Sequence, residues 1–278
     1  MKMPGLFQED SPFLRADTRQ TRWAIPYHRE CLNARTEVLL VENKAALAGK
    51  SVLDIGSHIG TFAYSALQLG AEKVHGIDTE TETTAKCLSL FEETKVDPSR
   101  YRFETRDAIE YLESVEENSF DTALCFGVLY YVAEPLTLLR LLKRATRETI
   151  LLDTFTASYA AVQGKEAPNI ADSITDKTLE QPMALYALTR ARKKDYELQN
   201  TFQHRGKPLS LTTYPTQALL ELWFESLDFQ YRKMDWSHYI QQTRHYSDLI
   251  TSDQKRTSHW ADVYASNIRV AYQLKIQK

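Results

Sequence analysis

Cysteine is scarce in this 278-residue sequence, and no run of apolar residues is long enough to cross a membrane. The three cysteines, Cys31, Cys87 and Cys125, are far apart and show none of the paired spacings of metal or redox sites, so we expect buried thiols. No apolar stretch approaches the roughly 20 residues of a spanning helix, and the first residues lack the basic-then-apolar order of a signal peptide. These absences predict a cytoplasmic protein without a membrane segment.

The short motifs of several common enzyme classes are also missing. The sequence contains no GxSxG, which marks the nucleophile of many serine hydrolases, and no GxGxxG, which marks dinucleotide-binding folds. Its seven histidines are scattered and form no pair with the spacing of zinc ligands. We therefore predict neither triad hydrolysis nor a metal site.

The sequence is not that of a strongly basic nucleic-acid binder, and its acidic residues are concentrated in one central block. The formal net charge is −3, and residues 50–153 hold 11 Lys and Arg against 18 Asp and Glu. The segments on either side of this block are mildly positive. An anionic partner would therefore have to meet the flanking segments and not the central block.

Residues 51–153 alternate short apolar runs with helical stretches, which is the pattern of a parallel sheet covered on both faces. The predicted strands are 51–55, 73–78, 101–105, 120–126 and 149–154. The predicted helices between them are 60–69, 83–94, 108–114 and 135–145, the last of which starts at Pro135, a residue suited to a first helical turn. Right-handed connections between the strands then give a βαβ series.

Later residues complete the sheet with strands at 229–234 and 267–276, the second pairing antiparallel with the first. Residues 154–213 show no strand alternation and include a charge-rich helical piece from Pro182 to Asn200. We therefore predict a seven-stranded, mostly parallel α/β sandwich. A helical cap covers residues 1–49, and the 50–278 domain carries a helical, lid-like insertion at 154–213 and a connector at 235–266.

The segment VLDIGSHIG (52–60) is a predicted strand that ends in an acidic residue and a glycine turn and leads at once into a helix. At Gly56 the absence of a Cβ allows a sharp turn and a close approach by a ligand, and the N–H groups of the following helix face the same space. Asp54 stands two residues before this glycine. The segment therefore predicts a nucleotide-type pocket.

This segment resembles motif I, (D/E)xGxGxG, of the class I (Rossmann-like) S-adenosylmethionine-dependent methyltransferases. In that family the acidic residue faces the methionine end of the cofactor and the glycines pass beneath it, so the resemblance gives these roles to Asp54, Gly56 and Gly60, with Ser57 and His58 in the same turn. His58 replaces the middle glycine of the motif. Its alternative interpretation is a loop histidine with no chemistry.

Two further strand ends extend the resemblance. Asp78 ends the second strand about 20 residues after the glycine turn, where doubly wound folds hold ribose hydroxyls. By the resemblance, Asp107 and Ala108 contact the adenine, although Asp107 is equally suited to cap the following helix. The segment after the fourth strand resembles motif IV, in which the strand end and the following loop close over the methionine part of the cofactor. The resemblance implies that residues 126–129 line this loop, Phe126 and Gly127 among them, that Tyr130 and Tyr131 stand at its mouth, and that Tyr131 contacts the acceptor.

A narrower resemblance involves GVLYYVAEPLTLLRLLK (127–143) and SDQKRTSHW (252–260). These strings are similar to GVLYHRRSPLxHLxQLK and EEQRRTEW of the tRNA carboxymethyltransferases that act on wobble uridine. The resemblance implies that Tyr130 and Arg269 bind the carboxylate of carboxy-S-adenosylmethionine. The HRR of the family is replaced here, and its N-terminal lysine has no counterpart among residues 27–29. A simple alternative for Arg269 is an exposed arginine on an edge strand.

These observations favour an S-adenosylmethionine-dependent methyltransferase that acts on a small-molecule acceptor in an enclosed pocket. His238, in the aromatic connector, is a candidate for contact with that acceptor, and packing of a lid is its alternative. A tRNA-modifying enzyme that uses the methyl or the carboxymethyl donor is the second interpretation. The third is a protein that binds the cofactor without catalysis.

Overall fold

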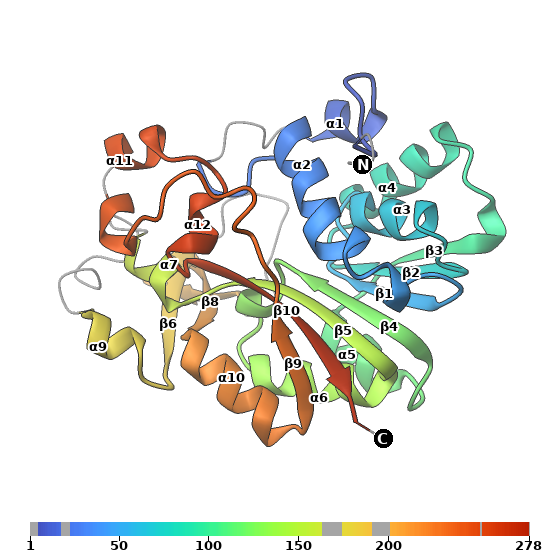
Figure 1. Cartoon of the computed structure of the whole chain (residues 1–278). Helices are drawn as coiled ribbons and strands as arrows, with labels where there is room; N and C mark the ends of the chain where they lie inside the picture. The colour runs from blue at the N-terminus through green and yellow to red at the C-terminus, as the bar shows by residue number, and fades with distance from the viewer. Residues whose placement is uncertain (1–4, 18–22, 163–173, 191–200, 251, 278) are drawn as a thin grey trace.

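Figure 1 shows the computed structural model, which describes residues 5–17, 23–162, 174–190, 201–250 and 252–277. A seven-stranded sheet in the order β3-β2-β1-β4-β5-β10-β9 forms its centre. The first five strands are parallel, and β10 runs antiparallel to both β5 and β9. The strands are β1 (Ser51–Ile55), β2 (Lys73–Asp78), β3 (Tyr101–Thr105), β4 (Phe120–Phe126), β5 (Thr146–Phe155), β9 (Phe229–Lys233) and β10 (Arg269–Ile276). The predicted α/β fold with a mostly parallel sheet is confirmed.

Helices cover both faces of this sheet because the side chains of each strand alternate between two apolar cores. In β1, Val52 packs into one core, and Leu53 and Ile55 pack into the other. Helices α3 (Thr61–Gln68) and α4 (Thr81–Glu93) cover the first face, and α5 (Ala108–Ser114), α6 (Pro135–Ala145) and α10 (Gln217–Ser226) cover the second (Figure 1). Cys31, Cys87 and Cys125 are buried free thiols, as expected.

The N-terminal residues form short helices that pack on the same face as α3 and α4 (Figure 1). These are α1 (Pro12–Ala16), α2 (Arg29–Thr36), the π-helical turn η1 (Glu37–Val41) and η2 (Lys44–Ala46). The remaining short helices are η3 (Pro98–Arg100), η4 (Leu129–Tyr131), α7 (Ala157–Val162), α9 (Asp176–Leu179), η6 (Tyr246–Leu249), α11 (Ser252–Thr257) and α12 (Asp262–Ala265). No helix within the described ranges has the length and apolar character needed to cross a membrane.

The insertion at 154–213 differs from the prediction. It contains α7 and α9, but also a three-stranded antiparallel sheet in the order β6-β8-β7, formed by β6 (Ala184–Arg190), β7 (Thr201–His204) and β8 (Lys207–Pro215). The predicted helix from Pro182 to Asn200 is therefore wrong for residues 184–190, which form β6. Residues 191–200 of that prediction lie outside the described residues. The Ala and Leu residues of 184–188 favour a helix locally, but pairing along all seven residues of β6 with the distant β8 overrides that preference.

Candidate active site

A small cleft opens at the carboxyl ends of β1 and β4. These two strands are neighbours, and the chain order reverses between them, which is where doubly wound folds bind ligands. The cleft is lined by Tyr27, Asp54, Gly56, Ser57, His58, Thr61, Phe62 and Phe126. Five of these residues were predicted from the sequence. Tyr27, Thr61 and Phe62 were missed, although Thr61 and Phe62 directly follow the glycine turn.

The glycine turn has a backbone that only glycine adopts easily. Gly56 and Gly60 have φ values of 69° and 78°, in the left-handed region. A Cβ on Gly56 would overlap the side chain of Val128, and one on Gly60 would overlap Cys87 and Phe91. The N–H of Gly56 donates to the carbonyl of Ile77 (2.8 Å), which fixes the turn against β2.

His58 also has a left-handed backbone, with φ at 51°. Its N–H donates to Oδ2 of Asp78 (2.9 Å), and its Nδ1 lies 3.9 Å from Oδ2 of Asp17, a buried carboxylate of the N-terminal cap. The ring of Tyr27 is 6.0 Å from the imidazole. The residue that replaces the middle glycine therefore joins the glycine turn to the cap.

Asp54 is buried, and its Oδ2 accepts no hydrogen bond from any described residue. Burial, together with the nearby Asp78, raises its pKa to about 8. The hydroxyl of Thr61 is likewise buried without a partner in the described structure. Buried polar atoms without partners are costly, so this end of the cleft is built for a ligand that donates hydrogen bonds, and an ammonium group meets that requirement.

The next two strand ends carry the predicted adenosine contacts. Oδ1 of Asp78 accepts the N–H of Glu80 (3.0 Å), and burial raises the pKa of Asp78. Asp107 caps α5 through the N–H of Glu110 (2.9 Å), which confirms its capping role, and Ala108 is buried at the start of that helix. None of the three lines the cleft, so their contacts with ribose and adenine stay predictions.

The loop after β4 turns at Gly127, whose φ is 77° and whose N–H donates to the carbonyl of Asp153 (2.7 Å). Tyr130 is buried, with its ring stacked on Tyr214 of β8 at 5.6 Å, so the expectation that it stands at the mouth is wrong. The neighbouring Tyr131 is the exposed ring of the pair, at 37%. Tyr130 is buried and Tyr131 is exposed because only the ring of Tyr130 stacks on Tyr214 of the insertion. The sequence did not reveal this contact.

A buried cluster of charges lies beside this loop. Asp153, at the end of β5, accepts hydrogen bonds from Nε and Nη2 of Arg269 (2.8 and 2.7 Å) and from Nη2 of Arg35 on α2 (2.7 Å). The hydroxyl of Tyr264 donates to the same carboxylate (3.2 Å). Arg269 is therefore not an exposed edge residue, because β10 lies between β5 and β9 and the side chain is 3% exposed.

This cluster holds one carboxylate and two guanidinium groups. Burial would raise the pKa of Asp153, but Arg269 and Arg35 outweigh it and hold that pKa below its ordinary value, so the carboxylate is charged. Burial raises the pKa of Tyr264 well above its ordinary value, which keeps the phenol neutral. The cluster therefore has a surplus positive charge. Nε of Arg35 is buried without a partner in the described structure, and the guanidinium lies 4.7 Å over the ring of Phe62, which lines the cleft.

These features fit S-adenosylmethionine, the cofactor that the sequence resemblance implies. Asp54 and Thr61 would hold its ammonium group, Arg35 would meet its carboxylate, and Asp78 would hold the ribose. No motif or pattern in the sequence pointed to Arg35. Asp153 could have been noticed as the one acidic residue near the end of the predicted strand 149–154, where a buried charge needs a partner.

His238 is not brought to the cleft. It is exposed, packs edge-on against Tyr239 at 5.4 Å, and contributes to the electrostatic environment of Glu42 in the cap. Trp236 and Tyr264 in the same connector are buried and stacked at 3.6 Å, so these aromatic residues pack the connector. A contact between His238 and an acceptor has no support from this arrangement.

Residues 47–203 match a family model described as a methyltransferase domain. A tRNA U34 carboxymethyltransferase of Campylobacter curvus is 29% identical over 171 residues, which cover 56% of this chain and 52% of that protein. A ubiquinone biosynthesis O-methyltransferase of Hahella chejuensis is 33% identical over 109 residues, which cover 38% of this chain and 43% of the other. The chain thus spans about half the length of these relatives.

Solved structures show the same fold at low sequence identity. An S-adenosylmethionine-dependent methyltransferase from Mesorhizobium loti superposes with a TM-score of 0.52 at 14% identity, covering 88% of this chain and 99% of that one. The PH0226 protein of Pyrococcus horikoshii superposes with a TM-score of 0.55 at 12% identity, covering 98% of this chain and 100% of that one. At such identities the likeness concerns the fold alone.

Proposed function

Because the chain belongs to the methyltransferase domain family, we propose that it transfers a methyl group from S-adenosylmethionine to a small-molecule acceptor in an enclosed site. The observation that carries this proposal is the cover over the carboxyl edge of the sheet. Tyr27 of the cap lines the cleft, and Tyr214 of the insertion stacks on Tyr130 in the loop after β4. Phe126, Tyr130 and Phe155 are all less than one tenth exposed. Such enclosure is typical of sites for small ligands.

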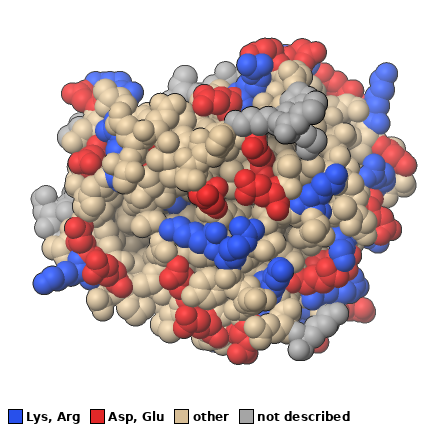
Figure 2. Space-filling view, viewed as in Figure 1, with Lys and Arg blue, Asp and Glu red and all other residues tan. Residues whose placement is uncertain are grey.

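The charge on one face of the molecule agrees with a small acceptor. Figure 2 shows basic and acidic side chains interspersed over the visible face of the described residues, where the basic side chains near the centre form only a short strip with acidic side chains above and below it. RNA-binding surfaces gather Lys and Arg along the path of the phosphates. The phosphates of a folded RNA would therefore be attracted only weakly to this face.

In the proposed reaction, the donor supplies a methyl group already activated by its sulfonium, so the protein's task is alignment and exclusion of water. Asp54, Asp78 and Arg35 would fix the donor at three separate groups. The aromatic residues Phe126, Tyr130 and Tyr214 would keep water from the transfer region. The geometry supports binding and orientation by these side chains without assigning a base.

Carboxymethyl transfer to a tRNA wobble uridine is the second candidate, and one observation favours it. A Cβ on Gly127 would lie 3.4 Å from Nη2 of Arg269 and 3.7 Å from the hydroxyl of Tyr130, so both predicted carboxylate-binding side chains converge on the loop after β4. However, Nε and Nη2 of Arg269 already bind Asp153. We therefore keep the ordinary methyl donor in the proposal.

The test begins with the intact protein and a donor labelled on the transferred carbon. Incubation with a small-molecule extract and, separately, with total tRNA should place label in the small-molecule fraction only. Label in tRNA would replace the proposal with the second candidate. Calorimetric binding of S-adenosylhomocysteine without label in either fraction would instead indicate a non-catalytic binding protein.

The donor is tested by titrating S-adenosylmethionine and carboxy-S-adenosylmethionine against the wild type and Arg269→Leu. We expect the wild type to prefer the ordinary donor. Tight binding of the carboxylated donor that Arg269→Leu abolishes, while binding of S-adenosylmethionine survives, would favour the second candidate.

A further inference from the structure

The connector at 235–266 contacts the charged cluster through the hydroxyl group of Tyr264. Among the residues that the structure describes, the carboxylate of Asp153 has four donors: Nε of Arg269 and the hydroxyl of Tyr264 bind Oδ1, while Nη2 of Arg269 and Nη2 of Arg35 bind Oδ2. Tyr264 is the only uncharged donor of the four. We propose that Tyr264 is a positioning residue for the end of the site that holds the donor's carboxylate.

The reason lies in how weakly Arg35 is fixed. Arg269 grips Asp153 through two nitrogens, but Arg35 reaches it through Nη2 alone, so the direction of Arg35 depends on where Oδ2 points. The bond from Tyr264 to Oδ1 restrains rotation of the carboxylate and thereby fixes Oδ2. Without it, the carboxylate is free to follow Arg269, and Arg35 loses the bond that fixes its direction beside Phe62, which lines the cleft.

Tyr264 is itself held firmly. Its ring is stacked on Trp236 with centroids 3.6 Å apart and planes inclined by 8°. Tyr264 belongs to α12, which begins at Asp262, and the side chains of Tyr264 and Trp236 are both buried. The hydroxyl is therefore presented to Asp153 from a rigid support.

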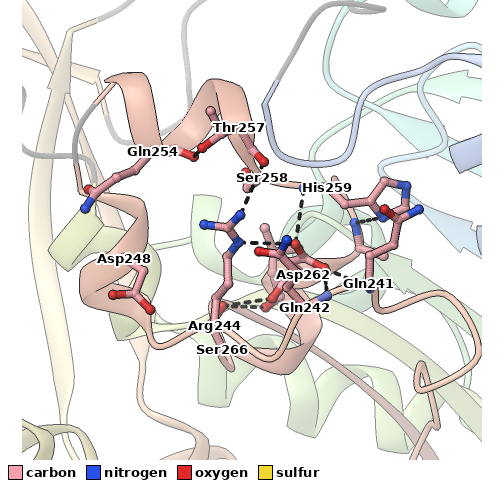
Figure 3. A network of polar contacts seen from close by, with 12 residues as sticks. Gln241, Gln242, Arg244, Asp248, Gln254, Thr257, Ser258, His259, Asp262 and Ser266 are labelled. Carbon is pink, nitrogen blue, oxygen red and sulfur yellow. Dashed lines mark hydrogen bonds and ion pairs between the residues drawn. The ribbon is translucent and has the colours of Figure 1, made fainter.

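Figure 3 shows how Asp262 fixes that helix. Its Oδ1 accepts the N–H groups of Gln241 and Gln242 (3.1 Å each), and its Oδ2 accepts the N–H of His259 (3.2 Å). Nε of Arg244 lies 3.5 Å from the same carboxylate. One buried carboxylate thus ties the start of the connector to its end, immediately before Tyr264.

The connector also docks on the N-terminal cap, which carries Arg35. The hydroxyl of Tyr239 donates to Oε2 of Glu37 (2.6 Å), and Nε2 of His259 lies 3.3 Å from Oε1 of Glu30. The connector therefore contacts both Asp153 and the cap. Its bond to Asp153 is the contact that gives it a role in shaping the donor site.

The experiment compares two ligands that differ at the amino-acid end. S-adenosylhomocysteine carries the carboxylate, whereas 5′-methylthioadenosine shares the adenosine and the thioether but lacks it. Tyr264→Phe keeps the ring on Trp236 and removes only the hydroxyl. Calorimetry should show binding of S-adenosylhomocysteine weakened by roughly three- to tenfold, and binding of 5′-methylthioadenosine unchanged. Arg35→Gln should show the same selective loss, and a larger one.

Tyr239→Phe is the matched control, because it removes a hydroxyl from the same connector at a contact outside the cluster. It should leave the ratio of the two affinities unchanged, and Asp262→Asn should shift that ratio in the direction of Tyr264→Phe. An unchanged ratio in Tyr264→Phe, or an equal loss for both ligands, would overturn the positioning role. The same selective loss in Tyr239→Phe would do so too, because docking in general would then explain it.

This inference rests on the proposed donor, and the titration separates the two failures. A wild-type protein that binds neither ligand would overturn the proposed function and the inference together. A wild type that binds S-adenosylhomocysteine, with no selective change in Tyr264→Phe, would overturn only the inference. Thermal unfolding of each variant verifies that the fold is intact before affinities are compared.

Discussion

Oδ2 of Asp78 accepts the backbone N–H of His58 at 2.9 Å, so the acidic end of β2 holds the glycine turn at the end of β1. The carboxylate predicted to bind ribose therefore also supports the turn that is predicted to pass beneath the cofactor. The two functions use one side chain, and its removal should affect both.

Asp78→Ala should weaken binding of S-adenosylhomocysteine by roughly 1–3 kcal/mol, the cost of losing charged hydrogen bonds. Isothermal titration calorimetry measures this loss. Asp97→Ala is the control, because Asp97 caps η3 through the N–H of Ser99 (2.9 Å) and is not among the residues predicted to contact the cofactor, so its removal should leave cofactor affinity unchanged. Unchanged affinity in Asp78→Ala would remove this residue from the site.

Asp54 should make the cofactor-free protein less stable as pH rises. Burial and Asp78 raise its pKa to about 8 from an ordinary value of 3.8, so the unfolded chain loses this proton at a lower pH than the folded protein does. The unfolded state therefore binds fewer protons between about pH 4 and pH 8, and the free energy of unfolding falls across that window. Above about pH 8 this contribution is constant.

Asp54→Asn removes the titration and should flatten the pH dependence. Urea unfolding at pH 5 and pH 8 should show the wild type losing more stability than the variant, by a few kcal/mol at most. The variant should also bind S-adenosylhomocysteine more weakly, because an amide, unlike the carboxyl group of Asp54, cannot ionise beside the ligand's ammonium group. Parallel pH profiles for the two proteins would contradict the raised pKa.

Gly56→Ala should damage the cofactor turn for two separable reasons. The new Cβ would overlap Val128, and the left-handed φ of 69° disfavours any side chain. We expect loss of cofactor binding and destabilisation by roughly 1–3 kcal/mol. Adding Val128→Ala relieves the overlap but not the backbone strain, so it should restore stability only in part. Complete restoration would mean that φ contributes little at this position.

Hydrogen exchange should show the insertion and the connector protected when S-adenosylhomocysteine is present. The hydroxyl of Thr213 on β8 donates to the carbonyl of Ala133 (3.0 Å), so the insertion is tied to the segment after the cofactor loop. Peptides from 207–216 and 236–266 report on this coupling, and peptides from α10 serve as the reference. Exchange that is identical with and without ligand would place these segments outside the site.

The central strands could be predicted from the sequence because their signal is local. β1 to β4 have the predicted bounds, since each is a short apolar run bounded by polar or turn residues. The glycine turn is equally local, and Asp54, Gly56 and His58 meet in the cleft as expected. In these cases a few adjacent residues determine both the backbone and the site.

The insertion and the charged cluster depend on residues far apart in the chain. β6 forms because it pairs with β8, and no pattern within residues 184–190 predicts this pairing. Arg35, Asp153 and Arg269 likewise come from the cap, β5 and β10, and only the fold shows that both guanidinium groups bind the one carboxylate of Asp153. Periodicity and short motifs depend on residues that are adjacent in sequence, so they do not predict contacts between residues far apart in the chain.

The position of β10 between β5 and β9 has a consequence for how the chain acquires its fold during synthesis. β9 leaves the ribosome before β10, yet it has no place in the sheet until β10 has paired with β5. Until then, Asp153 lacks the two bonds from Arg269, so the charged cluster stays incomplete. Completion of the cluster is thus coupled to β10, which follows β9 in the chain, and a nascent chain that exposes only β1 to β5 would hold the glycine turn without the charge that Arg269 contributes.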